Sequence, residues 1–321
     1  MEGASQSVLV LDKQQTRDAL EWGRLITALR EGFQAGCEMP LRHHHDFDIP
    51  DEASGTLLLM PAWIPGKYQG VKVANVVPGN AARGLPAVSA SYLLSCARTG
   101  ALLAFIDGAE LTNRRTAAAS ALAAGYLARE DAVSLLMVGT GSLAINLIQA
   151  HAAVRPIKRV SVWGRRIEKA ESVATQARTL GFDAQAVSDL EMATKKADII
   201  SCATVTTDAL VRGEWLAPGS HLDLVGAFKP TMRESDDTAI QRSQVFVDTR
   251  AGATKEAGDI VQPLATGVIT LDDIRADLYD LARAIHPGRR TNSEITMFKS
   301  VGAALEDLTA AILAYETITR P

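Results

Sequence analysis

The stretch LLMVGTGSLA, residues 135–144, decides the fold. Its four leading apolar residues are typical of a buried strand, and apolar residues at helical spacing follow it. Gly139, Gly141 and Ala144 match Gly-x-Gly-x-x-Ala, the turn that holds a pyrophosphate between a strand and a helix. In such turns the first glycine permits the tight bend, the second lets the backbone approach the phosphates, and the third small residue allows close packing. We therefore predict that a nicotinamide dinucleotide binds along Gly139, Thr140, Gly141, Ser142, Leu143 and Ala144; an ordinary glycine turn is the alternative.

Strand and helix patterns alternate around this turn. Short apolar runs at 133–138, 159–163, 183–187, 198–202, 221–225 and 244–248 predict strands, and residues 143–154 and 167–180 predict helices between them. Such alternation implies crossover connections and a parallel sheet covered by helices. We expect a Rossmann-type, doubly wound α/β domain over residues 116–299.

The end of the second strand of this domain bears on the choice of nucleotide. An NAD enzyme usually ends this strand with an acidic residue that binds the ribose hydroxyls. Here the segment is VWGRR, residues 162–166, with no carboxylate before Glu168. Since guanidinium groups suit a 2′-phosphate, we predict that Arg165 and Arg166 favour NADP(H), with NAD(H) possible; a solvated arginine pair is the alternative.

The first part of the chain has a different pattern of predicted helices and strands. We expect a strand at 8–11, a helix at 16–33, a loop-rich stretch at 37–54 and strands at 56–60, 70–77 and 102–106. An alanine-rich helix at 116–128 opens the Rossmann domain. Residues 293–317 have apolar positions every three or four residues, which predicts one long helix that packs back onto the first part. The expected first domain is thus a discontinuous α+β domain, residues 1–115 with 300–321.

Composition excludes several classes of protein. The 321 residues carry a net charge of −4 without a basic cluster, which argues against nucleic-acid binding. No apolar run reaches the roughly 18 residues of a membrane span, and no signal peptide is expected. Three widely spaced cysteines predict reduced thiols in a cytoplasmic protein. Three successive histidines, His43–His45, have no further ligand cluster to complete a metal site, so no metal is expected.

Three positively charged residues in the first part of the chain are candidates for binding an anionic substrate. Lys72 lies inside the apolar segment Gly70–Val73, Arg42 follows Met39-Pro40-Leu41, and Arg115 precedes the alanine-rich helix. A cation within an apolar strand needs a partner or a solvated cleft, and arginine offers two parallel hydrogen bonds to a carboxylate. These cations fit an anionic substrate, although each taken singly also fits a structural salt bridge.

The chain resembles the ornithine cyclodeaminase/mu-crystallin family along nearly its whole length. The resemblance rests on the segments MPA (60–62), GVK (70–72), PGN (78–80), LTNRRTAA (111–118), GTG (139–141), EAGD (256–259) and TMFKSVG (296–302). It implies a homodimer and a discontinuous substrate-binding and dimerisation domain beside a Rossmann domain. It also implies that Arg42, Lys72 and Arg115 hold the substrate carboxylate near the nicotinamide ring.

The segment GAFKPTMRE, residues 226–234, distinguishes branches of that family. Phe228 falls where ornithine cyclodeaminases carry a catalytic aspartate, and a phenyl ring cannot accept a proton. The segment instead resembles the branch that reduces Δ1-pyrroline-2-carboxylate to proline and Δ1-piperideine-2-carboxylate to pipecolate. We expect this ketimine reductase activity, with Phe228 packed near the substrate ring and Lys72 as a possible proton donor. An alanine-type amino-acid dehydrogenase, an ornithine cyclodeaminase and an NADP-dependent binding protein resembling mu-crystallin remain the alternatives.

Overall fold

The chain divides into two compact units. The structure, a computed structural model, describes residues 7–320. One unit comprises Met1–Arg115 with Ala304–Pro321, and the other comprises Thr116–Ala303. The second boundary lies at 303/304, whereas the sequence predicts it at 299/300. Helix α3 (Gly108–Leu127) contains the first boundary.

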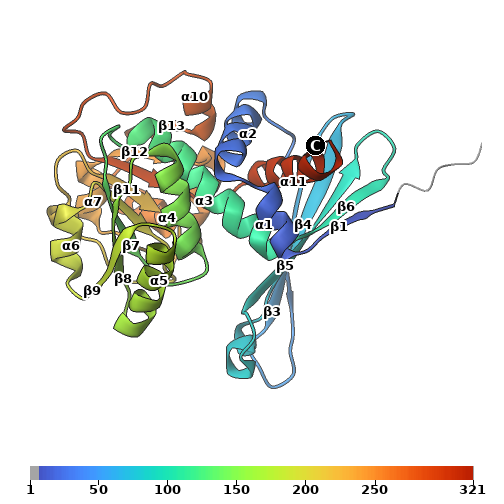
Figure 1. Cartoon of the computed structure of the whole chain (residues 1–321), viewed down its shortest axis with the longest axis horizontal. Helices are drawn as coiled ribbons and strands as arrows, with labels where there is room; N and C mark the ends of the chain where they lie inside the picture. The colour runs from blue at the N-terminus through green and yellow to red at the C-terminus, as the bar shows by residue number, and fades with distance from the viewer. Residues whose placement is uncertain (1–6, 321) are drawn as a thin grey trace, which may run out of the picture. The chain divides into compact units, whose positions relative to one another are not determined.

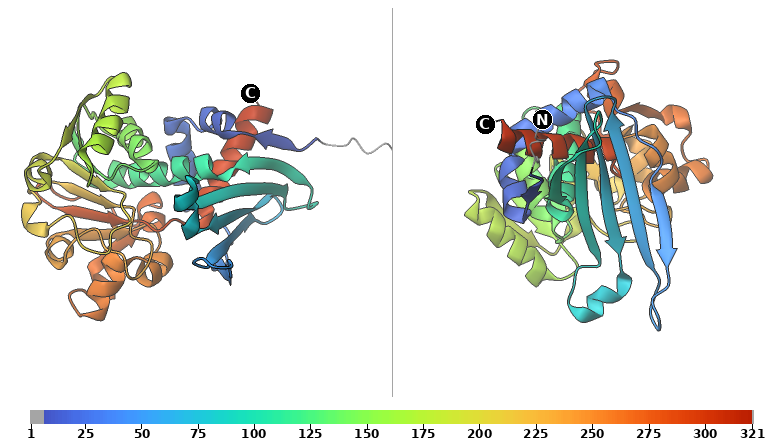
Figure 2. Two further views of the ribbon diagram at one scale, coloured as in Figure 1. Left: turned by 90° about the horizontal axis from the view of Figure 1, so that it is seen from below. Right: turned by 90° about the vertical axis from the view of Figure 1, so that its right-hand side faces the viewer.

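The first unit is built on a six-stranded sheet in the order β1-β6-β5-β4-β3-β2. Strands β2 to β6 pair antiparallel, and β1 pairs parallel with β6. Helix α11 packs against β3 to β6 and against α1 and α2, and Figure 2 shows it along one face of the sheet. The bounds are β1 (Leu9–Leu11), α1 (Lys13–Ala19), α2 (Trp22–Ala35), β2 (His43–Phe47), β3 (Gly55–Ile64), β4 (Tyr68–Val76), the 3-10 turn η1 (Pro78–Arg83), β5 (Val88–Cys96), β6 (Leu102–Asp107) and α11 (Ala304–Thr319).

The two faces of this sheet differ. Residues opposite one another in the ladders form rows across the strands, and alternate rows point to opposite faces. The row Met60, Lys72, Tyr92 and Ile106 is buried. The neighbouring row, on the opposite face, is apolar but stays accessible; it consists of Pro61, Val71, Leu93, Phe105 and Val10.

Three sequence predictions for this unit were wrong. The expected helix 16–33 is two helices, because Glu21 accepts hydrogen bonds from the backbone of Gly23 and Arg24 and starts α2 anew. The expected loop 37–54 contains β2, an exposed edge strand whose polar side chains give no alternating pattern. Strand β5 was missed, although Val88, Ala90, Tyr92 and Leu94 occupy alternate positions.

The second unit contains eight parallel strands in the order β13-β12-β14-β11-β10-β7-β8-β9. Figure 1 shows these strands between helices, which confirms the predicted Rossmann-type fold. The bounds are β7 (Ser134–Val138), α4 (Leu143–Val154), β8 (Arg159–Trp163), α5 (Ile167–Thr179), β9 (Asp183–Val187), α6 (Leu190–Lys196), β10 (Ile199–Cys202), η2 (Gly213–Trp215), β11 (His221–Leu224), α7 (Asp237–Arg242), β12 (Gln244–Val247), α8 (Arg250–Glu256), α9 (Gly258–Ala265), η3 (Leu271–Asp273), β13 (Ile274–Asp277), α10 (Leu278–Ala282) and β14 (Thr296–Lys299).

The long helix predicted over 293–317 was wrong in its first half. Residues Thr296–Lys299 form β14, which inserts between β11 and β12 and is buried throughout. The apolar residues Ile295, Phe298 and Val301 recur every three residues, so periodicity did not separate this short buried strand from a helix. Gly302, at φ 83°, then turns the chain before α11 begins at Ala304.

Residues 7–320 contain neither a candidate membrane-spanning helix nor a candidate metal-binding cluster. None of the described helices is long and apolar enough to cross a membrane. Within the same residues no group of three or more His, Cys, Asp or Glu side chains could hold a metal ion. Cys37, Cys96 and Cys202 are free thiols.

Candidate functional site

The glycine turn of the second unit has the shape of a phosphate cradle. Gly139 follows β7 at φ 126°, a conformation that L side chains rarely adopt. A Cβ atom on Gly139 would also lie 2.5 Å from the carbonyl oxygen of Ala203. At Gly141, by contrast, a Cβ atom would have no neighbour within 4 Å, so open space lies over that backbone. This open space next to the amides that begin α4 is what the close approach of a pyrophosphate would require.

The predicted nucleotide-binding residues lie around this turn. One pocket of about 290 Å³ is lined by Gly139, Thr140, Gly141, Arg165 and Arg166, together with residues 203–206. Both arginines are exposed. Ser142 lines an adjoining hollow beside Thr140 and Gly141. Leu143 and Ala144 form the first turn of α4 and line neither hollow; Ala144 is buried, as close helix–strand packing requires.

The topology explains why these loops meet. Strands β8 and β9 extend the sheet on one side of β7, and β10 extends it on the other. The connections thus reverse direction between β7 and β10, and ligands of doubly wound sheets bind at such a switch point. The loops after β7 and β10 both line the pocket, together with the loop after β8.

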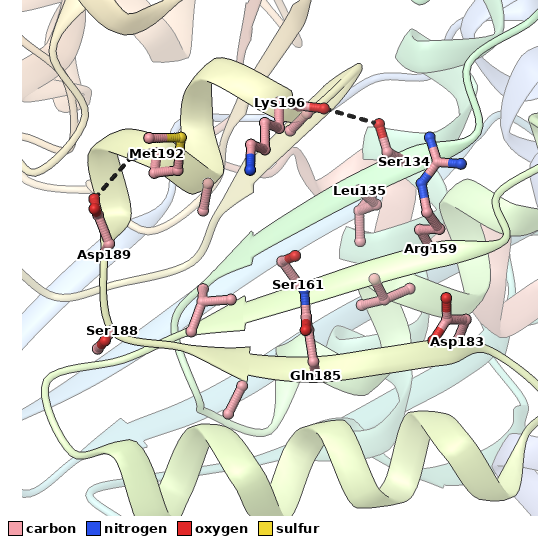
Figure 3. A pocket seen from close by; sticks show the side chains of 15 residues that line it. Ser134, Leu135, Arg159, Ser161, Asp183, Gln185, Ser188, Asp189, Met192 and Lys196 are labelled. Carbon is pink, nitrogen blue, oxygen red and sulfur yellow. Dashed lines mark hydrogen bonds between the residues drawn. The ribbon is translucent and has the colours of Figure 1, made fainter.

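A larger hollow lies elsewhere on the same sheet. It measures about 510 Å³ and spreads over β7 to β9 and under α6, as Figure 3 shows. Its wall includes the first residues of three strands, Ser134, Arg159 and Asp183, and no residue of the glycine turn. Ser161 and Gln185 add polar side chains from the strand faces (Figure 3). The lining of this hollow mixes polar and apolar side chains, and the hollow is distinct from the pocket at the glycine turn.

The first unit brings the predicted substrate cations together around Asp307 of α11. Lys72 Nζ lies 2.7 Å from Asp307 Oδ2, and Arg115 Nε lies 2.9 Å from Asp307 Oδ1. Arg115 Nη1 also pairs with Glu306 Oε2 at 2.7 Å. Arg42 precedes β2, is half-buried, and acts electrostatically on both Lys72 and Asp307.

The charges of this cluster are buried and strongly coupled. Burial lowers the pKa of Lys72 to about 8, and the neighbouring positive charge of Arg115 acts in the same direction, while Asp307 opposes it. Burial acts to raise the pKa of Asp307, but the charges of Arg115 and Lys72 hold it below its usual value. Three cations and two carboxylates leave one positive charge in excess. That excess matches a single carboxylate ligand.

Phe228 lies in the second unit, in the loop after β11. Its side chain is 40% exposed, and Lys229 Nζ lies 6.0 Å from the centre of its ring. The exposed ring is available for contact with an apolar ligand, and its predicted place beside the substrate ring stays a prediction.

Sequence reasoning missed three side chains of the cation cluster. Glu306 and Asp307 form a buried acidic pair among the apolar residues that begin α11, and that pair was the available signal. Tyr92 is the neighbour of Lys72 across the ladder, and its buried hydroxyl has no hydrogen-bond partner among the described residues. Gly70 makes room for this ring, because a Cβ atom there would lie 2.4 Å from the Tyr92 hydroxyl oxygen.

Comparisons with known proteins show which family this chain is similar to. Residues 10–320 match the model of the ornithine cyclodeaminase/mu-crystallin family. A Delta(1)-pyrroline-2-carboxylate reductase of Paracoccus denitrificans is 41% identical over 91% of this chain and 91% of its own. An alanine dehydrogenase of Archaeoglobus fulgidus is 30% identical over 96% and 94%.

The fold of a solved relative is also similar. The Thermococcus litoralis Delta(1)-pyrroline-2-carboxylate reductase, solved with NADH and L-proline, is 33% identical, superposes with a TM-score of 0.91, and covers 97% of this chain and 98% of its own. Because the family model matches residues 10–320 and these relatives cover nearly the whole chain, the chain belongs to the ornithine cyclodeaminase/mu-crystallin family.

Proposed function

We propose that this protein is an NAD(P)H-dependent reductase of cyclic ketimine carboxylates, which converts Δ1-pyrroline-2-carboxylate to proline and Δ1-piperideine-2-carboxylate to pipecolate. The observation that supports the proposal is the cluster of buried Lys72 and Arg115 and half-buried Arg42 around Asp307, with one positive charge in excess. Relatives named Delta(1)-pyrroline-2-carboxylate reductase, among them one solved with L-proline, support this substrate class.

The cluster would bind and orient the substrate carboxylate. Arg115 donates hydrogen bonds from Nε and Nη1 to its two acidic partners, and Lys72 forms an ion pair with one oxygen of Asp307. Each cation therefore keeps hydrogen-bonding capacity for a ligand. Because Asp307 pairs with both, it fixes the separation of the two cationic groups, and fixed geometry of this kind lowers the cost of reaching the reactive arrangement.

The bound nicotinamide would supply a hydride to the imine carbon. A protonated imine is already a strong hydride acceptor, so positioning and charge stabilisation account for most of the required catalysis. Lys72, with a pKa of about 8, is the residue of the cluster best able to exchange a proton near neutral pH. Its catalytic role is proposed beside its role as a carboxylate ligand.

Cyclodeamination of ornithine is disfavoured by Phe228. That position carries an exposed phenyl ring on the loop after β11, which offers neither a base nor a charge for a substrate ammonium group. An alanine-dehydrogenase activity is the second candidate, since the A. fulgidus relative carries that name. Reduction of pyruvate in the presence of ammonia distinguishes it from ketimine reduction.

Arg165 and Arg166 support a preference for NADP(H). Both are exposed at the end of β8 and line the pocket that also contains the glycine turn. The T. litoralis structure contains NADH, so the family fold alone does not decide between the two nucleotides. A 2′-phosphate would meet two guanidinium groups where an NAD enzyme offers a carboxylate.

The accessible face of the first unit's sheet supports a homodimer. Val10 and Phe105, neighbours across the ladder, are 62% and 41% exposed. With Leu93, Val71 and Pro61 they form one apolar row across five strands. Contiguous exposed apolar surface of this kind marks an association site, and a second copy of this chain is the occupant we propose. The cytoplasmic location expected from the sequence stays a prediction.

A steady-state assay tests the proposed function. The purified protein is given NADPH or NADH with Δ1-pyrroline-2-carboxylate, with Δ1-piperideine-2-carboxylate, or with pyruvate plus ammonia. We expect oxidation of the nucleotide with the cyclic ketimines. Turnover of pyruvate alone would favour the dehydrogenase, and turnover of none of them would favour a binding protein.

A further inference from the structure

Three buried charged residues meet at the carboxyl edge of the second unit's sheet. Glu234 lies in the loop after β11, Asp259 in the first turn of α9, and Lys299 at the end of β14. Asp259 and Lys299 lie in segments on which the family resemblance rests, and Glu234 lies in the segment that distinguishes its branches. The substrate and phosphate contacts proposed above use none of the three. Buried charges are costly unless they are paired, so this cluster calls for a physical role.

Glu234 joins two loops through one carboxylate. Its Oε1 accepts hydrogen bonds from the Thr204 backbone at 2.7 Å and from the Thr204 hydroxyl at 2.8 Å. Its Oε2 accepts from the backbone amides of Gly226 at 2.6 Å and Ala227 at 3.3 Å. The loops after β10 and β11 are therefore fastened to the same side chain.

Asp259 and Lys299 hold Glu234 in place. Asp259 Oδ1 accepts from the backbone amides of Glu234 at 2.9 Å and Ser235 at 3.0 Å. Lys299 Nζ lies 3.3 Å from Asp259 Oδ2 and 3.9 Å from Glu234 Oε2, so it offsets part of their negative charge. Removing a member of such a buried group leaves an uncompensated charge.

Two glycines show how closely these loops approach. A Cβ atom on Gly226 would lie 1.9 Å from the carbonyl oxygen of Thr204, and one on Gly258 would lie 1.9 Å from that of Met232. A side chain at either position would push the loops apart. Glycine at these positions therefore allows the loops after β10 and β11 to lie close enough for Glu234 to contact both loops.

The cluster is linked to the nucleotide pocket through Thr204. Residues 203–206 line that pocket together with Gly139 and Gly141. The backbones of Gly139 and Ala203 approach so closely that a Cβ atom added to Gly139 would collide with Ala203. We propose that Glu234 is a positioning residue for the cofactor: by hydrogen-bonding the loops after β10 and β11, it fixes one wall of the nucleotide pocket. This inference rests on the proposed function, in which that pocket holds a nicotinamide dinucleotide.

The protonation of Glu234 gives the cluster a measurable signature. Burial raises the pKa of Glu234 to about 7, and the negative charge of Asp259 acts in the same direction, while Lys299 and the Thr204 hydrogen bonds lower it. Cys202 on β10 also faces this group, and burial together with Glu234 raises the pKa of its thiol. Protonation would convert one acceptor oxygen into a hydroxyl and break part of the four-bond set, because a protonated carboxyl loses acceptor capacity.

The test compares Glu234→Gln with a matched control, Asp198→Asn. Asp198 also accepts backbone hydrogen bonds, from Val133 at 3.0 Å and Ser134 at 2.9 Å, but at the amino end of β7. Both variants lose one structural carboxylate of the same sheet, at opposite edges. Thr204→Val, which removes one of the four donors of Glu234, serves as a milder second variant.

Dissociation constants of NADH are measured by nicotinamide fluorescence between pH 6 and 8.5, with thermal unfolding of each protein alongside. NADH is chosen because it lacks the 2′-phosphate, which titrates in this range. We expect Glu234→Gln to raise the Kd of NADH about tenfold or more, because a hydrogen bond to a charged group contributes at least that factor. Thr204→Val should raise this Kd less. Asp198→Asn should leave Kd within about twofold of wild type, since its site is remote from the pocket.

The pH profile separates positioning from general stability. In wild type, Kd should rise as pH falls below about 7, the pKa of Glu234, and in Glu234→Gln it should stay high and flat. A wild-type Kd in Glu234→Gln, or equal losses of affinity in both carboxylate variants, would overturn the inference. If wild type binds neither NADH nor NADPH, the proposed function itself fails, and this inference fails with it.

Discussion

Asp307→Asn probes how the cation cluster is held. Asp307 forms an ion pair with Lys72 at 2.7 Å and accepts a hydrogen bond from Arg115 at 2.9 Å, and its side chain is fully buried. Asparagine keeps the shape of the side chain but removes the charge that opposes the lowered pKa of Lys72. An opposite charge at this range changes a pKa by about one to three pH units. The pKa of Lys72, about 8 in the intact cluster, should therefore fall to about 7 or below.

The consequence is a displaced pH profile. At pH 7.5 a pKa of about 8 leaves about three quarters of Lys72 protonated, whereas a pKa of about 7 leaves about one quarter. In wild type kcat/KM for Δ1-pyrroline-2-carboxylate should fall as pH rises through about 8, because the neutral amine no longer attracts the carboxylate. In Asp307→Asn the fall should begin at least one pH unit lower, which is about a threefold loss at pH 7.5 from Lys72 alone.

The assay is initial-rate kinetics of both proteins from pH 5.5 to 9.5. Titration of the substrate imine affects wild type and variant alike, so the difference between the profiles reports the protein. Glu306→Gln is the matched control: it removes the neighbouring carboxylate of α11, which pairs with Arg115, and retains the Lys72–Asp307 pair. Its alkaline limb should remain near the wild-type position. Identical alkaline limbs in wild type and Asp307→Asn would refute this account of Lys72.

Three further outcomes are expected. Arg115→Ala should raise KM for the ketimine about tenfold to a hundredfold, the value of a charged hydrogen-bonded contact, with NADPH affinity in fluorescence titration nearly unchanged; an unchanged KM and kcat would remove Arg115 from the site. Wild type should bind NADPH about tenfold to a hundredfold more tightly than NADH, and Arg165→Asp should reverse that order; equal affinities in wild type would show the arginines to be merely solvated. Phe105→Asp, at a side chain that is 41% exposed, should convert a dimer to a monomer in light scattering, whereas a monomeric wild type would contradict the proposed interface.

Local patterns predicted the nucleotide half of the molecule well. The turn at Gly139 and Gly141 and the arginines after β8 depend on residues adjacent in sequence, so their spacing reveals their arrangement. The fold of the second unit followed from strands that alternate with helices. Here local sequence and tertiary structure agree.

Contacts between residues far apart in the sequence could not be predicted in the same way. Asp307 lies 192 positions along the chain from Arg115, and no local spacing connects the two. Strand β14 was mistaken for helix because Ile295, Phe298 and Val301 fit helical spacing, and only pairing with β11 and β12 identifies the segment as a strand. Strand β2 was missed for the complementary reason: its polar side chains face solvent, and only pairing with β3 shows that it is a strand.

The most direct test of the central claim follows the transferred hydrogen. Δ1-Pyrroline-2-carboxylate is incubated with the protein and with NADPH that carries deuterium at both C4 positions of the nicotinamide ring, and the product is examined by mass spectrometry and NMR. The account predicts proline with one deuterium at its α-carbon, formed in step with oxidation of the nucleotide. Absence of turnover, or proline without deuterium at the α-carbon, would contradict it.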